Sequence, residues 1–215
     1  IWPQAPRYTA VYDKNQASWA DVFEVQPSFL QHIPLAKNHH EWFPWLTPMA
    51  FEAFSFDAFN VVLSVTSAEA KNIVTKPGTV HICYCLTPTR YLWSAHKDYE
   101  RSGVAGKVLR ALSPTLKKWD LVAASRPDYY FAISETVKQR IQTYYHRDVR
   151  DVIYPPVDVK KFNCSPRGDY FLTVARLVEY KRVDIVIDAF NQLGWPLVVI
   201  GVGREKNRLM RRAMR

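Results

Sequence analysis

Short apolar segments alternate with amphipathic helical patterns along most of the chain. Several apolar segments are continuous, as in Leu197-Val198-Val199-Ile200-Gly201, which is typical of strands that are buried on both faces. Strands that alternate with helices predict an α/β fold, in which helices cover a parallel sheet. The predicted strands are residues 22–26, 60–65, 80–85, 129–134, 152–154, 170–175 and 197–201.

The helical segments between these strands have recognisable ends. Val183, Ile187 and Phe190 recur at helical spacing, and Gly194 follows as the predicted C-terminal cap. Ser134 stands at an N-cap position, ahead of an apolar stripe formed by Val137, Ile141 and Tyr144 or Tyr145. Residues 104–124 and 204–215 are also predicted helices, the first with a break or kink at Pro114.

A pair of prolines marks the predicted domain boundary. Pro155 and Pro156 remove two backbone donors and fix φ, so neither a helix nor a central strand continues through them. We therefore predict a first α/β domain at 1–154, a linker at 155–168 and the start of a second domain at 169–215. Because the sequence begins with Ile1 and stops inside a helical pattern at Arg215, we expect a fragment truncated at both ends.

The net charge of +9 raises the question of a nucleic-acid partner. Five of these nine charges come from residues 204–215, which hold six basic residues and Glu205. Leu209 and Met210 lie on one side of that predicted helix, so its arginines are interpreted as a solvated face, with a phosphate-rich partner or an anionic membrane surface as the alternative. We expect no nucleic-acid partner.

The sequence favours a cytoplasmic protein. No window approaches the ~20 apolar residues of a membrane helix, and residues 1–7 do not resemble a signal peptide. Cys83 and Cys85 lie two apart on a predicted strand and are poorly placed to bridge, which favours reduced thiols in a reducing compartment. Peripheral association with the inner face of the membrane stays open.

Two cations follow the first strand of the second domain. Arg176 stands at the carboxyl end of that strand and Lys181 at the start of the next helix, a pattern that suits a diphosphate. An ion pair of Arg176 with Glu179 and a solvated Lys181 are the structural alternative. Gly201 and Gly203 form a Gly-x-Gly turn after the second strand, where backbone could approach a ligand closely, although any tight strand-to-helix turn can produce this pattern.

The first domain offers a second candidate loop. Leu86 to Trp93 follows a predicted strand and presents Arg90 between aromatic residues, with Pro88 in the same loop. Charge and ring stacking suit an anionic or sugar ligand there. The alternative, to which we give the same weight, is that Arg90 forms a structural ion pair and does not bind a ligand.

These segments together resemble glycosyltransferase family 4, in particular its mannosyltransferase-like branch of bacterial polysaccharide biosynthesis. The resemblance rests on the order of the motifs as much as on any single one. The matching residues are Asn60 to Ser64, His81 to Trp93, Ala132 to Glu135 with Arg140-Ile141, Val152 to Asp158, Phe171 to Phe190, and Leu197 to Gly203.

The resemblance implies a GT-B fold, with two Rossmann-like domains facing a cleft. It further implies a retaining, metal-independent hexosyltransferase that uses no cofactor and takes a nucleotide sugar as substrate, with mannose from GDP-mannose as the preferred donor. Arg176 and Lys181 match the positions that hold the donor diphosphate, and Arg90, Pro88 and Ser134 would line the first-domain side. The acceptor would be a saccharide or a lipid-linked saccharide.

Some expected features of the family are missing or changed. Its paired glutamates, seven residues apart, would lie beyond Arg215, and Leu86 stands where many relatives carry a histidine. A nucleotide-sugar epimerase of the same two-domain shape is therefore the alternative enzyme. A non-catalytic module that binds sugar or nucleic acid is the alternative from another class.

Overall fold

The computed structural model describes residues 4–39, 42–94, 103–164 and 166–213. The chain divides into an N-terminal unit, 1–156, and a C-terminal unit, 157–215. This division falls inside the linker predicted at 155–168.

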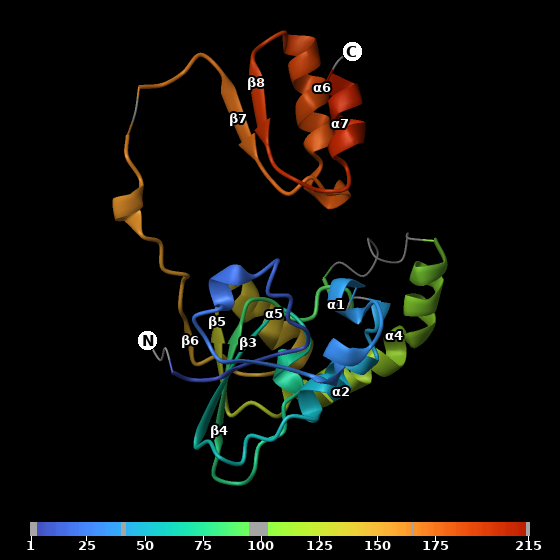
Figure 1. The fold of residues 1–215 in the computed structure, drawn as a ribbon, viewed down its shortest axis with the longest axis vertical. Coiled ribbons are helices and arrows are strands. Elements are labelled where there is room, and N and C mark those ends of the chain that lie inside the picture. Colours follow the sequence, from blue (N-terminus) through green and yellow to red (C-terminus); the bar gives the residue numbers. More distant parts are fainter. Residues whose placement is uncertain (1–3, 40–41, 95–102, 165, 214–215) are drawn as a thin grey trace. The chain divides into compact units, whose positions relative to one another are not determined.

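The N-terminal unit is built on a four-stranded parallel sheet (Figure 1). Its strands are β3 (Val61–Thr66), β4 (Val80–Cys85), β5 (Tyr129–Ala132) and β6 (Asp151–Val152), adjacent in that order. The sequence predicted all four to within two residues at each end. The α/β class with parallel sheets is therefore confirmed.

Two helices form the crossovers of this sheet. The first, α4 (Gly103–Ala124), joins β4 to β5, and α5 (Glu135–Tyr145) joins β5 to β6. The predicted N-cap is confirmed, because Ser134 Oγ accepts a hydrogen bond from the Val137 N–H. α4 continues through Pro114, so a break at that residue is wrong, whereas a kink there stays a prediction. Packing of the helix through Leu116, Ala123 and Ala124 offsets the missing backbone bond.

Short elements make up the rest of this unit. β1 (Arg7–Thr9) pairs in parallel with β2 (Val25–Pro27). The strand predicted at 22–26 corresponds to β2, which begins and ends further along the chain, and β1 was not predicted. A second apolar cluster forms around Leu30, Phe51 and Phe56. The remaining elements are η1 (Ser18–Ala20), η2 (Phe29–His32), α1 (Ala36–His39), α2 (Leu46–Glu52) and η4 (Glu69–Asn72).

The main core of the N-terminal unit lies on one face of the sheet. Cys83, Cys85 and Tyr130 are buried there against Val137 and Ile141 of α5. Both crossovers pack on that face because the strand order advances in one direction and such connections are right-handed. On the opposite face, β3 exposes three apolar side chains. The expectation of strands buried on both faces is therefore wrong for β3, where Val61, Leu63 and Val65 are 58%, 49% and 53% exposed. It is also wrong for the run Leu197 to Gly201, in which Val198 and Ile200 are exposed.

The C-terminal unit contains a two-stranded parallel sheet and two helices. β7 (Phe171–Val174) pairs with β8 (Leu197–Ile200), as predicted. α6 (Val183–Leu193) follows β7 and ends at Gly194, whose φ of 66° confirms the predicted cap. α7 (Lys206–Ala213) follows β8, and its core contact is Leu209 against Leu177, Val183 and Ile187. The short elements are η5 (Val159–Lys161) and η6 (Glu179–Lys181).

No helix in the described ranges is both long and apolar enough to cross a membrane. The longest of them, α4, carries charged residues along its length.

Candidate anion-binding loops and a buried polar network

Both predicted cations of the C-terminal unit lie on the connection between β7 and α6. Arg176 follows β7 by two residues, and Lys181 ends η6; both side chains are exposed. Two backbone hydrogen bonds of 3.0 Å fold this connection tightly, from the Val178 N–H to the Arg176 carbonyl and from the Lys181 N–H to the Val178 carbonyl. Lys181 Nζ also lies 5.5 Å from the centre of the Tyr180 ring. The two cations therefore share one compact turn at the carboxyl end of the strand.

The loop after β8 lies against this turn. The Leu177 N–H donates to the Val202 carbonyl at 2.8 Å, and the Glu205 N–H donates to the Leu177 carbonyl at 3.1 Å. A Cβ at Gly201 would lie 1.9 Å from the Ala175 carbonyl oxygen, and one at Gly203 would lie 2.2 Å from that of Leu177. Both positions therefore require glycine for the two loops to meet. A contact of either glycine with a ligand stays a prediction.

Positive charge exceeds negative charge on these two loops. Residues 175–182 and 201–206 carry five basic side chains against Glu179 and Glu205. Arg182 pairs with Asp184 at 3.1 Å, and Glu205 pairs with Arg208 at 2.5 Å. The hydrogen bond from Arg182 holds the pKa of the Asp184 carboxyl below its ordinary value. Within the described residues, no ion pair neutralises Arg176 or Lys181. An anion is therefore attracted to the carboxyl ends of β7 and β8.

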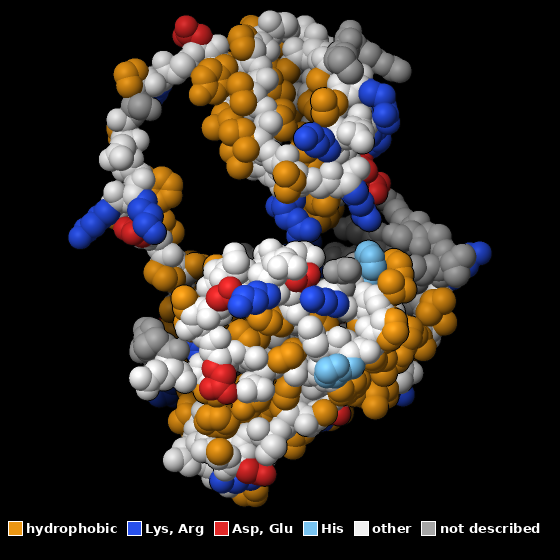
Figure 2. Space-filling view, viewed as in Figure 1, with side chains coloured by type: hydrophobic (Ala, Val, Ile, Leu, Met, Phe, Trp, Pro, Cys, Tyr) orange, Lys and Arg blue, Asp and Glu red, His pale blue; other side chains and the backbone are white. Residues whose placement is uncertain are grey.

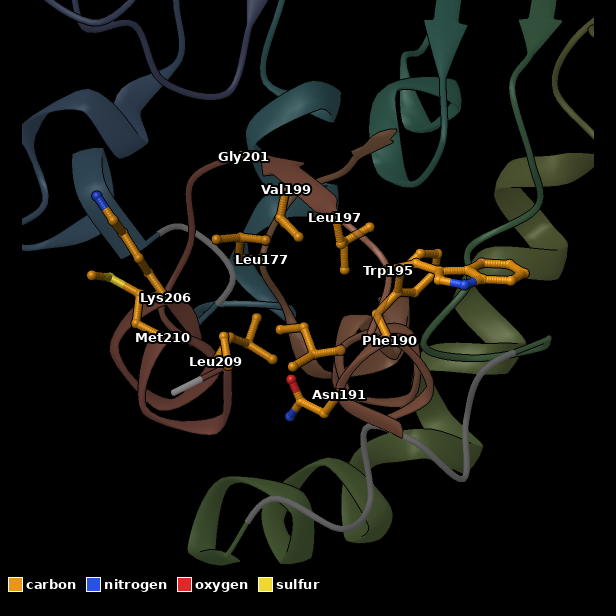
Figure 3. Close-up of a pocket in the computed structure, with 12 residues that line it drawn as sticks. Leu177, Phe190, Asn191, Trp195, Leu197, Val199, Gly201, Lys206, Leu209 and Met210 are labelled. Atoms are coloured by element: carbon orange, nitrogen blue, oxygen red, sulfur yellow. The ribbon is translucent and has the colours of Figure 1, made fainter. Parts of the chain in front are cut away.

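A cavity of the C-terminal unit has a different lining. It measures about 430 Å³ and lies between the helices and the sheet, where Leu177, Leu197 and Val199 point into it (Figure 3). Lys206 extends away from this space. Of the predicted site residues only Gly201 lines it, and neither Arg176 nor Lys181 does. The cavity is thus a mainly apolar space that borders the charged loops through Leu177, Gly201 and Lys206, without Arg176 or Lys181.

The predicted site residues of the N-terminal unit have different surroundings. Arg90 is exposed on the loop after β4, whereas Pro88 in the same loop is fully buried and shapes the loop from within. Ser134 is half-buried and uses an oxygen lone pair to cap α5. Of these three residues, Arg90 is the one that is exposed.

A buried ion pair, which the sequence analysis missed, holds the loop after β4. Lys71 of η4 and Asp120 of α4 are 1% and 4% exposed, with Lys71 Nζ 2.5 Å from Asp120 Oδ1. Thr89 Oγ1 donates to the same carboxylate oxygen at 2.7 Å, and Trp93 Nε1 donates to Oδ2 at 2.7 Å. The Thr89 N–H in turn donates to the Tyr145 hydroxyl at 3.1 Å. This Lys71–Asp120 network fixes the loop on both sides of Arg90.

One signal could have revealed this network. Asp120 is the sole acidic residue of α4, and helical spacing places it on the same buried stripe as Leu116, Ala123 and Ala124. A carboxylate on a buried stripe requires a partner, because an unpaired buried charge is very costly. No local pattern in the chain indicates that Lys71 is that partner.

A buried serine–histidine pair lies below this loop in the sheet. Ser64 Oγ lies 2.8 Å from His81 Nε2, and the two residues are 5% and 0% exposed. Among the residues that the structure describes, none is hydrogen-bonded to His81 Nδ1, so no carboxylate of this set orients the ring as in a catalytic triad. Burial lowers the pKa of His81 to about 4. The pair is therefore a neutral structural contact that a substrate cannot reach.

Comparisons with known proteins gave no family: no family model matched the sequence, and no curated protein matched it significantly.

Proposed function

We propose that this chain belongs to a retaining, nucleotide-sugar-dependent hexosyltransferase of GT-B type, resembling family 4. The observation that carries the proposal is the pair of exposed cations, Arg176 and Lys181, on one turn at the carboxyl ends of two parallel strands. Ligands of open parallel sheets bind at that edge. The proposed donor is a nucleoside diphosphate sugar, with GDP-mannose as the preferred candidate.

In this proposal the two cations stabilise the leaving group. The bond between the anomeric carbon and the diphosphate oxygen breaks, and its electron pair stays on the diphosphate. The acceptor hydroxyl oxygen bonds to that carbon, and the hydroxyl proton passes to the departing diphosphate. Neither Arg176 nor Lys181 forms an ion pair with another described residue. Their positive charges can therefore balance the charge of the leaving diphosphate without a metal ion. Each hydrogen bond to such a charged group contributes about 1.5–3 kcal/mol.

The N-terminal unit would contact the acceptor, a saccharide or a lipid-linked saccharide. Arg90 is exposed, and Thr89 and Trp93, which flank it, are hydrogen-bonded to the buried Asp120 carboxylate. A cation on a loop anchored in this way loses little conformational freedom when it binds a polar ligand. This rigidity supports a recognition role for Arg90.

Calorimetric titration with GDP and with GMP tests the proposal. The unsubstituted chain should prefer GDP, because only GDP carries the second phosphate. Arg176→Ala and Lys181→Ala should each weaken GDP binding by roughly 1.5–3 kcal/mol and reduce the preference over GMP. Arg211→Ala, which removes an exposed cation of α7, is the matched control and should bind GDP as the unsubstituted chain does. Unchanged GDP affinity in both loop variants would remove these residues from the site.

A further inference from the structure

One face of the two-stranded sheet in the C-terminal unit is exposed and apolar. Side chains alternate along β7 and β8, so Leu197 and Val199 pack with Val183 and Ile187 of α6, while their neighbours point the other way. Figure 2 shows hydrophobic side chains gathered over these strands, which Figure 1 locates. We call the outward set the β7–β8 face: Tyr170, Leu172, Val174, Val198, Ile200 and Val202.

The side chains of the β7–β8 face form a regular ladder. Leu172 is the partner of Val198 across the two strands, and Val174 is the partner of Ile200. These four residues are between 39% and 69% exposed, and the two residues at the ends of the ladder are more than half exposed. The face is therefore one uninterrupted apolar surface.

The size of the β7–β8 face suits association with another protein surface. A two-stranded sheet that is packed on one side only is marginally stable, and an exposed apolar patch of several hundred Å² marks an interaction site. Burying the six side chains in two copies of the chain would remove on the order of 1,000 Å² from water. Specific protein interfaces begin at about 1,200 Å², so a dimer built on this face should be weak and concentration-dependent.

The distribution of charge favours a second copy of the chain over a lipid surface. None of the six side chains is charged, whereas binding to anionic lipid depends on basic side chains beside the apolar ones. A lack of charge is typical of the core of an interface between identical chains. The excess of positive charge lies instead on the loops beyond the carboxyl ends of the strands, while Arg167 and Asp169 near the amino end of β7 have opposite signs. Two copies with antiparallel strands keep their positive ends apart.

We propose that two copies of this chain associate through the β7–β8 face, with the strands of the two copies antiparallel. A twofold axis places the same apolar ladder against itself, and two sheets pack face to face in this way in a β-sandwich. In this arrangement β7 of one copy faces β7 of the other, and Val174 of one copy lies opposite Leu172 of the second copy. This inference does not depend on the proposed glycosyl transfer.

Sedimentation velocity over a range of protein concentrations tests the association. The unsubstituted chain should show a monomer–dimer equilibrium with a dissociation constant on the order of micromolar. Val174→Lys and Leu172→Glu should each weaken the dimer about tenfold or more, because a charge buried without a partner is costly. An equimolar mixture of these two variants should restore the dimer, because antiparallel packing places the introduced ammonium opposite the introduced carboxylate.

A matched control and a milder variant separate this face from general stickiness and from misfolding. Val61→Lys introduces the same charge on the exposed side of β3 in the N-terminal unit, and it should dimerise as the unsubstituted chain does. Val174→Thr/Ile200→Thr keeps two β-branched side chains, so it should preserve the strands and still weaken the dimer. Circular dichroism melts should show that all variants fold.

Three results would overturn the proposed dimer. The first is an unsubstituted chain that stays monomeric at the highest concentration or forms larger aggregates in place of a discrete dimer. The second is a dimer that Val61→Lys weakens as much as Val174→Lys does. The third is a monomeric chain that binds lipid vesicles through Val174, which would make lipid the occupant of this face. A mixture of Val174→Lys and Leu172→Glu that stays monomeric would overturn the antiparallel arrangement.

Discussion

At the scale of single residues, His81 has the clearest measurable consequence. Its ring is fully buried beside Ser64, and burial lowers its pKa from 6.5 to about 4. Asp128, which accepts the His81 backbone N–H at 2.8 Å, opposes this lowering, whereas the nearby Arg126 adds to it. The folded state therefore keeps His81 neutral at pH values where the unfolded chain already binds a proton.

The stability of the fold should consequently fall in mild acid. A lowered folded-state pKa means that the stabilisation is complete above the unfolded-state pKa and is lost as pH falls toward the folded-state value. Between about pH 7 and about pH 4.5, His81 should remove about 2–3 kcal/mol from the free energy of unfolding. Urea denaturation of the unsubstituted chain and of His81→Gln at both pH values isolates this contribution, because other groups titrate equally in the two proteins. A constant difference between them across this range would show that His81 does not titrate in this way.

At the scale of elements, the Lys71–Asp120 network joins η4, α4 and the loop that carries Arg90. Lys71→Met leaves Asp120 as an unpaired buried charge and should cost about 3–5 kcal/mol of unfolding free energy. Adding Asp120→Asn removes that charge, so the double variant should be less destabilised than the sum of the two single variants. Urea denaturation of all four proteins gives the coupling free energy directly. Strictly additive costs would mean that the pair contributes nothing as a pair.

Elements defined by local pattern could be predicted, and those defined by distant contacts could not. The strands near Val61, Val80, Phe171 and Leu197 and the caps at Ser134 and Gly194 are encoded by adjacent residues, so the sequence predicted them. β1 was not predicted, because its three residues form a strand only by pairing with β2 across the turn-rich segment between them. Pro114 does not break α4, because packing of the helix outweighs the local helix-breaking tendency of proline.

The candidate site also has a part that could be predicted from local pattern and a part that depends on distant contacts. The strand ends near Arg176 and Lys181 follow from the order of strands and helices. The anchoring of the Arg90 loop depends on Lys71 and Asp120, which are 49 residues apart and which no local pattern connects.

At the scale of the whole molecule, the two units differ in how completely they are packed. The C-terminal unit contains a cavity of about 430 Å³, and its strand residues Phe171, Leu172 and Val174 are more than half exposed. Unfilled apolar space and exposed strands lower the free energy of local opening. Hydrogen exchange on this chain should therefore show residues 166–213 much less protected than β3, β4 and β5. Equally slow exchange in both units would contradict this picture of loose packing.

We propose that the strand ends of the C-terminal unit hold the diphosphate of a nucleotide sugar. A titration with GDP-mannose, followed through backbone amide chemical shifts, is the sharpest test of this proposal. We expect saturable shifts concentrated at residues 175–182 and 201–206, where the exposed cations and the two close-packed loops lie. GMP should produce smaller shifts at the same amides, since it lacks the second phosphate. Shifts confined to the outward arginines of α7, or no saturable shifts at all, would contradict the claim.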